Sequence, residues 1–310
     1  MKKSIVLLVV ILSLAIAAVA GAQDFKIGYS CNNYNDTFQT VIEAYASAYA
    51  EEFGFGFQSA DAQNDEMRQQ DQIKAFIEDG YDALIVVAVN PMGVDPIIDL
   101  AADAGIPLVF VNRNPFDSEE DIPDGVYYVG SNEIDAGMYQ AMYVVDKLGA
   151  DATCGYVILL GELSNTATPL RTEGNHLVFD ELDGYKSLAE ETANWQRDQG
   201  LSKMENWITT YGDEICAVMS NNDEMALGAV EALEAAGMKD DVLVLGVDLI
   251  DDAVDAIEAG RLDCSVKQDG KGQGEGAVRI AMNVLKGEEV EKNTVIPFVP
   301  VSIENLAEYK

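Results

Sequence analysis

Residues 83–112, ALIVVAVNPMGVDPIIDLAADAGIPLVFVN, decide the fold class of this 310-residue chain. The apolar run Ala83–Asn90 is continuous rather than alternating, which is typical of a parallel strand buried on both faces. A helical stretch follows to Ala104, Gly105 ends it, and a second apolar run covers Pro107–Asn112. A strand, a helix and a strand in this order predict a parallel βαβ unit with a right-handed crossover.

The same order returns in residues 217–248, AVMSNNDEMALGAVEALEAAGMKDDVLVLGVD, where an apolar strand, a helix and a second strand follow one another. The chain therefore predicts an α/β fold of two similar lobes, each a doubly wound parallel sheet. Ligands of open parallel sheets bind beyond the carboxyl ends of the strands. The polar residues expected at those ends are Asp36, Asn90, Asn112, Arg113, Asn222, Asp223 and Asp248.

The charge of the chain excludes some partners. Acidic residues number 54 and basic residues 19, for a net charge of −35. Nucleic-acid binding draws its affinity from lysine and arginine contacts to phosphates, so DNA and RNA are not expected partners. Anionic membrane surfaces are excluded on the same ground. Apolar residues make up 48% of the chain, which is enough to build folded cores.

The N-terminus carries the pattern of a secretory signal peptide. Lys2 and Lys3 precede an apolar run from Ile5 to Val19, and small residues follow it at 20–22. This order predicts cleavage after Ala22, so that residues 1–22 are removed and the product is soluble and periplasmic or extracellular. A retained anchor helix is the alternative, because the apolar stretch approaches the length of a membrane span.

The four cysteines are Cys31, Cys154, Cys216 and Cys264. Export permits disulfides, and four cysteines allow three complete pairings. Their spacing is wide, however, and three of them lie in or beside short apolar runs. We therefore favour buried free thiols, which behave as small apolar side chains. No C-x-x-C motif or Cys/His pair indicates a metal site.

The sequence offers little for catalysis and more for binding. The single histidine, His176, lies in a probable helix with no nucleophile at a recognisable spacing, and neither a G-x-S-x-G motif nor a P-loop is present. A neutral polyhydroxyl ligand instead needs carboxylates and amides for its hydroxyls and flat rings for its C–H surface. Phe38 and Trp195 are the candidate rings, the latter in the irregular segment Glu191–Gln196. Phe38 also begins an apolar stripe at helical spacing, so a place in the core is the alternative for that ring.

Several motifs together resemble the periplasmic sugar-binding proteins of ABC transporters, of the galactose/glucose and ribose type. They are SNNDEMALGAVEAL at 220–233, YNDTF at 34–38, VNRNP at 111–115 and GVD at 246–248. The resemblance implies the type I fold of two lobes joined by a three-strand hinge, which closes on a sugar. It implies an N-terminal lobe of residues 23–112 plus 269–297 and a C-terminal lobe of residues 113–268 plus 298–310.

The resemblance also implies roles for individual residues. Aromatic rings would stack on the two faces of the sugar, and carboxylate, amide and guanidinium groups would bind its hydroxyls. The implied ligand-binding residues are Asp36, Phe38, Asn112, Asn165, Arg171, Trp195, Asn222, Asp248 and Gln268.

This chain departs from the family pattern at three places. Asn165 stands where the galactose type has His, and Ala167 where it has Asp, so one carboxylate contact is lost. The segment Gly149–Thr153 is too short and too poor in oxygen ligands to match the calcium loop of the galactose type, which predicts no calcium there.

The resemblance implies a monomeric carrier, not an enzyme and without a cofactor, for a neutral monosaccharide. An aldohexose such as galactose or glucose is expected, with an ABC permease as the receiving partner and a chemoreceptor as a further one. Two alternatives stay open. One is a sensory protein of the same fold that serves a receptor kinase, and the other is an exported sugar hydrolase.

Overall fold

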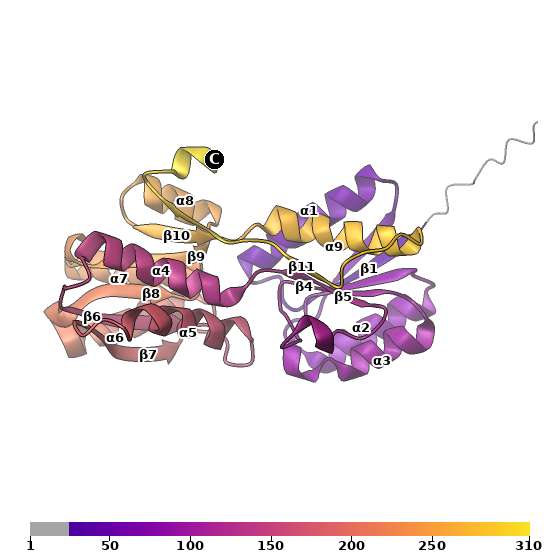
Figure 1. The fold of residues 1–310 in the computed structure, drawn as a ribbon, viewed down its shortest axis with the longest axis horizontal. Coiled ribbons are helices and arrows are strands. Elements are labelled where there is room, and N and C mark those ends of the chain that lie inside the picture. The colour runs from indigo at the N-terminus through magenta and orange to yellow at the C-terminus, as the bar shows by residue number, and fades with distance from the viewer. Residues whose placement is uncertain (1–24) are drawn as a thin grey trace, which may run out of the picture.

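The computed structural model describes residues 25–310, so the predicted signal peptide lies outside the described residues. Two α/β lobes lie side by side along the long axis of the molecule (Figure 1). The first lobe holds a parallel six-stranded sheet in the order β11-β5-β4-β3-β1-β2. Its elements are β1 (Lys26–Cys31), α1 (Thr37–Glu52), β2 (Gly56–Asp61), α2 (Glu66–Glu78), β3 (Ala83–Val86), α3 (Asp95–Ala104), β4 (Leu108–Val111), β5 (Val126–Gly130), α9 (Gly270–Leu285) and β11 (Asn293–Val295).

The second lobe repeats the architecture with a six-stranded sheet in the order β12-β10-β9-β8-β6-β7. All neighbouring strands are parallel except β12, which runs antiparallel to β10. Its elements are α4 (Glu133–Leu148), β6 (Cys154–Leu160), α5 (Ala167–Phe179), β7 (Tyr185–Thr192), α6 (Arg197–Tyr211), β8 (Ile215–Ser220), α7 (Asp223–Ala236), β9 (Leu243–Asp248), α8 (Asp251–Glu258), β10 (Cys264–Lys267) and β12 (Val299–Ser302). The expected pair of doubly wound lobes is confirmed.

The chain passes between the sheets three times, after β5, after β10 and between β11 and β12. The first passage lies at a different place from the lobe boundary predicted at residue 113. The segment 113–268 was expected to lie wholly in the C-terminal lobe, but Val126–Gly130 pairs with β4 and β11 of the first sheet. The first passage therefore comes one strand later than expected, at residues 131–132. The apolar strand β5 completes the first sheet because its side chains fill the core beneath α3.

Each sheet is buried on both faces, as the continuous apolar runs predict. In the first lobe, side chains of one face pack against α1 and α9, and those of the other face against α2 and α3. In the second lobe, α6, α7 and α8 cover one face and α4 and α5 the other. Gly274 allows α9 to pack closely on α1, since a Cβ there would collide with the Ile42 carbonyl oxygen. No helix within residues 25–310 is long and apolar enough to cross a membrane.

Two expectations about the second lobe need correction. Residues 191–196 are not irregular throughout, since β7 continues to Thr192 as a half-exposed edge strand whose polar sequence hides it. The four cysteines are not all free thiols, because Cys154 and Cys216 form a disulfide between β6 and β8, with Cα atoms 5.4 Å apart. The pairing of these neighbouring strands brings the two together. Cys31 and Cys264 are buried free thiols, as expected.

Candidate functional site

One cavity between the lobes collects every ligand-binding residue expected from the sequence. Asp36, Phe38 and Asn112 come from the first lobe, Gln268 from the second passage, and the others from the second lobe. The free volume of the cavity is only about 30 Å³, because side chains of the two lobes meet across it. The complete lining is Asp36, Phe38, Gln39, Asn112, Arg113, Asn165, Ala167, Arg171, Trp195, Asn222, Asp248 and Gln268.

Strand ends and helix starts place these side chains. Asp36 caps the N-terminus of α1, where its carboxylate accepts from the Phe38 backbone N–H at 3.0 Å. Asn112, Trp195 and Asp248 have φ angles of 68°, 66° and 115°. Such left-handed backbone conformations are uncommon for residues other than glycine and are concentrated at functional sites. The backbone at these three predicted residues is therefore strained, and their side chains line the cavity.

Arg171 is the most constrained charged group of the site. It reaches from α5, donates to Glu133 at 2.7 Å and to the Asn221 carbonyl oxygen, and lies 4.0 Å from Asp248. Its guanidinium lies over the rings of Trp195 and Phe298. The ion pair with Glu133 and the contacts with Asn221 and the two rings hold the guanidinium at the cavity wall. A ligand oxygen can reach it there.

The carboxylates of the site are poorly solvated. Burial raises the pKa of Asp36, although the nearby Arg113 partly offsets this effect. Burial raises the pKa of Asp248 well above its ordinary value, against the opposing charge of Arg171 and with added repulsion from Asp223. Burial likewise raises the pKa of Asp223 to about 7. Hydroxyl donors from a ligand would stabilise the ionised forms of Asp36 and Asp248, which only accept hydrogen bonds.

Asn222 lines the cavity and also makes two hydrogen bonds within the protein. Its side-chain oxygen accepts from the Met225 N–H at 3.0 Å and so caps α7, and its amide nitrogen donates to the Trp195 carbonyl oxygen at 3.2 Å. Both ends of the amide are therefore occupied in this closed form. The residue lines the cavity as expected, but these bonds also give it a structural task, since they hold the backbone that presents the indole ring.

Two lining residues, Gln39 and Ala167, were not predicted as candidates for the site. Arg113 is one of the polar residues predicted beyond the strand ends and lines the cavity, although it is absent from the ligand-binding set that the resemblance implies. Ala167 marks a departure from the family pattern. Gln39 carried a usable signal. It follows Phe38 on a helix face that is otherwise apolar, and a polar side chain at a buried position needs a partner.

Four lining side chains each hold one buried polar atom that has no protein partner within residues 25–310. These atoms are Gln39 Oε1, Arg113 Nε, Trp195 Nε1 and Gln268 Nε2. Five other buried side-chain atoms without a partner, on Tyr29, Tyr34, Asn175, Asn221 and Asn293, lie outside this lining. Buried polar groups of native proteins are nearly always hydrogen-bonded, so the gathering of four around one cavity favours a polar occupant. Three of the atoms are donors and one is an acceptor, which hydroxyl groups can match because they both donate and accept.

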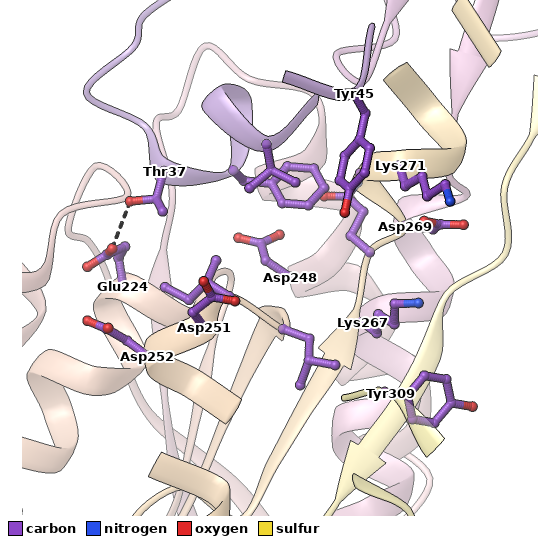
Figure 2. A pocket seen from close by; sticks show the side chains of 16 residues that line it. Thr37, Tyr45, Glu224, Asp248, Asp251, Asp252, Lys267, Asp269, Lys271 and Tyr309 are labelled. Carbon is purple, nitrogen blue, oxygen red and sulfur yellow. Dashed lines mark hydrogen bonds between the residues drawn. The ribbon is translucent and has the colours of Figure 1, made fainter. Parts of the chain in front are cut away.

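Direct contacts between the lobes show that the cleft is closed. Glu162 of the second lobe accepts from Arg113 at 3.2 Å and from Asn64 at 3.1 Å. On the other side of the cleft, Thr37 of α1 donates to Glu224 of α7 at 2.9 Å (Figure 2). That hydrogen bond borders a second, larger cavity of about 550 Å³, which shares Phe38, Asp248 and Gln268 with the first.

Comparison with known proteins places the chain in a family. Residues 27–289 match the periplasmic binding protein domain. A Rhizobium meliloti protein named for rhizopine binding is 43% identical over 300 residues, which cover 96% of each chain. An ABC transporter solute-binding protein from Bacillus halodurans C-125, solved with bound myo-inositol, is 39% identical with a TM-score of 0.85 and covers 92% of this chain and 97% of its own.

A second solved structure extends the likeness. The Caulobacter myo-inositol binding protein, bound to myo-inositol, is 26% identical with a TM-score of 0.85, and the match covers 93% of this chain and 96% of that chain. The domain match spans most of the chain, and relatives above 30% identity align over nearly its whole length. This chain belongs to the periplasmic binding protein family and has the type I fold of that family.

Proposed function

We propose that the protein is an exported, monomeric carrier that binds a neutral cyclic polyol between its lobes and delivers it to an ABC importer. The observation that carries this proposal is the set of four unpartnered polar atoms on Gln39, Arg113, Trp195 and Gln268 around one closed cavity. A ring with many hydroxyl groups supplies both the donors and the acceptors that these atoms need.

The identity of the ring is the finer part of the proposal. The resemblance to the galactose/glucose type implies an aldohexose, and a galactose-binding relative from Haemophilus influenzae is 28% identical. The relative of 39% identity holds myo-inositol instead. We therefore place a cyclitol of the inositol type first and an aldohexose second. The replacement of a family carboxylate by Ala167 favours this order, because the galactose type uses that contact.

The remaining features of the proposal follow from the carrier role. Closure would present surfaces of both lobes to the permease, and a chemoreceptor of the same cell envelope could read the same closed form. We propose no catalytic activity, since the polar groups around the cavity leave no nucleophile paired with a general base. The sensory alternative would use the same site and differs only in its partner.

The first experiment is a thermal-shift panel of myo-inositol, glucose, galactose, ribose and xylitol. A ligand that binds only the native state at 100 times its Kd stabilises it by about 2.7 kcal/mol, which a melting curve resolves. We expect the largest shift with myo-inositol. A larger shift with glucose or galactose would restore the aldohexose prediction, and no shift with any compound would refute the proposal. Mass spectrometry of the recovered ligand should show it intact, whereas a hydrolase would return products of a glycoside.

Two site variants and one control make the assignment specific. Asp36→Ala and Asp248→Ala remove carboxylates from the two lobes, and each should abolish most of the shift while circular dichroism stays native. The control is Asp103→Ala on the exposed face of α3, which should leave the shift unchanged. Unaltered affinity in both site variants would show that the ligand binds elsewhere.

A further inference from the structure

The buried glutamines of the protein divide into two groups. Gln69, Gln140 and Gln273 lie in the two cores with both ends of the amide hydrogen-bonded. Gln39 and Gln268 are equally buried, at 3% exposure each, but one amide atom of each has no partner within the described chain. These two also line the ligand cavity. Among the five buried glutamines, incomplete pairing therefore coincides with the cavity, although the buried amides of Asn175 and Asn221 each hold an unpaired atom outside its lining. The position of Gln39 and Gln268 at the cavity points to a ligand as their missing partner.

Gln39 is held in place by a chain of buried side chains. Its amide nitrogen donates to Asn112 Oδ1 at 2.8 Å, and Asn112 Nδ2 donates to Gln273 Oε1 at 3.2 Å. Gln273 Nε2 in turn donates to Ser131 Oγ at 3.4 Å. Ser131 lies in the first passage between the lobes, so the chain of hydrogen bonds runs from the cavity wall to the hinge.

This series of hydrogen bonds determines which atom of Gln39 remains without a hydrogen-bond partner. Each amide in it uses its nitrogen to donate toward the hinge, so the one atom without a partner at the cavity end is the acceptor Gln39 Oε1. An amide clamped at one end loses little further freedom when a ligand binds, so its contact is more favourable than that of a free side chain. A ligand that approaches Gln39 must therefore offer a hydrogen-bond donor.

We propose that Gln39 is a specificity-determining residue, whose fixed side-chain oxygen accepts a hydrogen bond from one hydroxyl group of the polyol. This inference rests on the proposed function and deepens it. A buried acceptor left without a partner disfavours an analogue that lacks the matching hydroxyl group. Gln39 thus discriminates among polyols by the presence and orientation of that single group.

The test is a double-mutant cycle between residue 39 and the ligand. Wild-type protein, Gln39→Leu and Gln39→Met are titrated by calorimetry with myo-inositol and with its single-position deoxy analogues. Wild type should lose about 10- to 100-fold in affinity for the analogue that lacks the matching hydroxyl group. In both variants the discrimination at that one position should fall to within twofold, while discrimination at the other positions persists.

A matched control separates this role from a structural one. Gln69 is also a buried glutamine of the first lobe, but Ser30, Val87 and Val89 satisfy its amide away from the cavity. Gln69→Leu should lower the melting temperature and leave the discrimination among analogues unchanged. The inference is overturned if the Gln39 variants weaken every analogue by the same factor, or if they keep the wild-type discrimination. Failure of wild type to bind any polyol or sugar would instead refute the proposed function, and this inference with it.

Discussion

The contact of Glu162 with the opposite lobe offers a direct test of how closure contributes to affinity. Its carboxylate accepts from the guanidinium of Arg113, which is 2% exposed, and from the Asn64 amide, while Glu162 itself is 22% exposed. A hydrogen bond to a charged group contributes about 1.5–3 kcal/mol when buried, and exposure reduces this value. We estimate a loss of about 2 kcal/mol of closed-state stability for Glu162→Ala, which corresponds to roughly 30-fold in the closing equilibrium.

The apparent Kd of a clamp depends on the fraction of protein that can close. If the ligand-free protein is mostly open, Glu162→Ala should raise the Kd by roughly 30-fold, and Glu162→Gln, which keeps one acceptor, by about fivefold. Calorimetry measures the Kd, and small-angle X-ray scattering reports whether the ligand-free form is open. The control is Glu304→Ala, which breaks an ion pair with Lys147 on the outer surface of the second lobe. Unchanged affinity together with unchanged scattering would refute the closure argument.

Three further predictions use other features of the structure. Thr37→Val removes the hydrogen bond to Glu224, worth about 1 kcal/mol, and should raise the Kd roughly fivefold in the same titration. Burial raises the pKa of Asp248, and protonation removes its charge and turns one of its accepting oxygens into a donor, so the affinity should fall as the pH drops through a value above the ordinary carboxyl pKa near 3.8. Titrations between pH 8 and pH 4 check this, and Asp248→Asn should flatten the profile. Because one disulfide joins two of the four cysteines, denatured but unreduced protein should react at two thiols per chain with Ellman's reagent, and four would disprove the pairing.

The sequence was sufficient for the architecture because its signals are local and repeated. Continuous apolar runs such as Ala83–Asn90 identify parallel strands, and residues such as Gly105, with φ of 68°, end the helices between them. Edge elements were harder to predict. β7 has mostly half-buried and exposed residues in no regular alternation, and its place in the sheet depends on pairing with β6, which no local pattern encodes.

The passage of β5 into the first sheet and the Cys154–Cys216 disulfide share the same cause. Both depend on which strands are neighbours, and that order is set by the packing of whole elements rather than by spacing along the chain. Candidates such as Asp36, Asn112 and Asp248 were easier to find because parallel strands place them at one edge of each sheet. Asn165, Arg171 and Gln268 were predicted only from the family resemblance. Gln39 was not predicted as a site residue because its orientation depends on hydrogen bonds that connect it to Asn112 and, through Asn112, to Gln273. Both residues come from distant segments of the sequence.

Closure of the cleft depends on two opposing contributions. Bonds between the lobes, such as Thr37–Glu224 and Arg113–Glu162, favour closure by about 1 kcal/mol or a little more each. Each buried polar atom left without a partner opposes closure by about 1–3 kcal/mol, and four such atoms line the cavity. The empty protein should therefore favour the open form, and a ligand favours closure by pairing these same atoms. Affinity and closure then depend on one set of contacts, so a polyol that leaves several of the atoms unpaired should bind weakly and also fail to compact the protein.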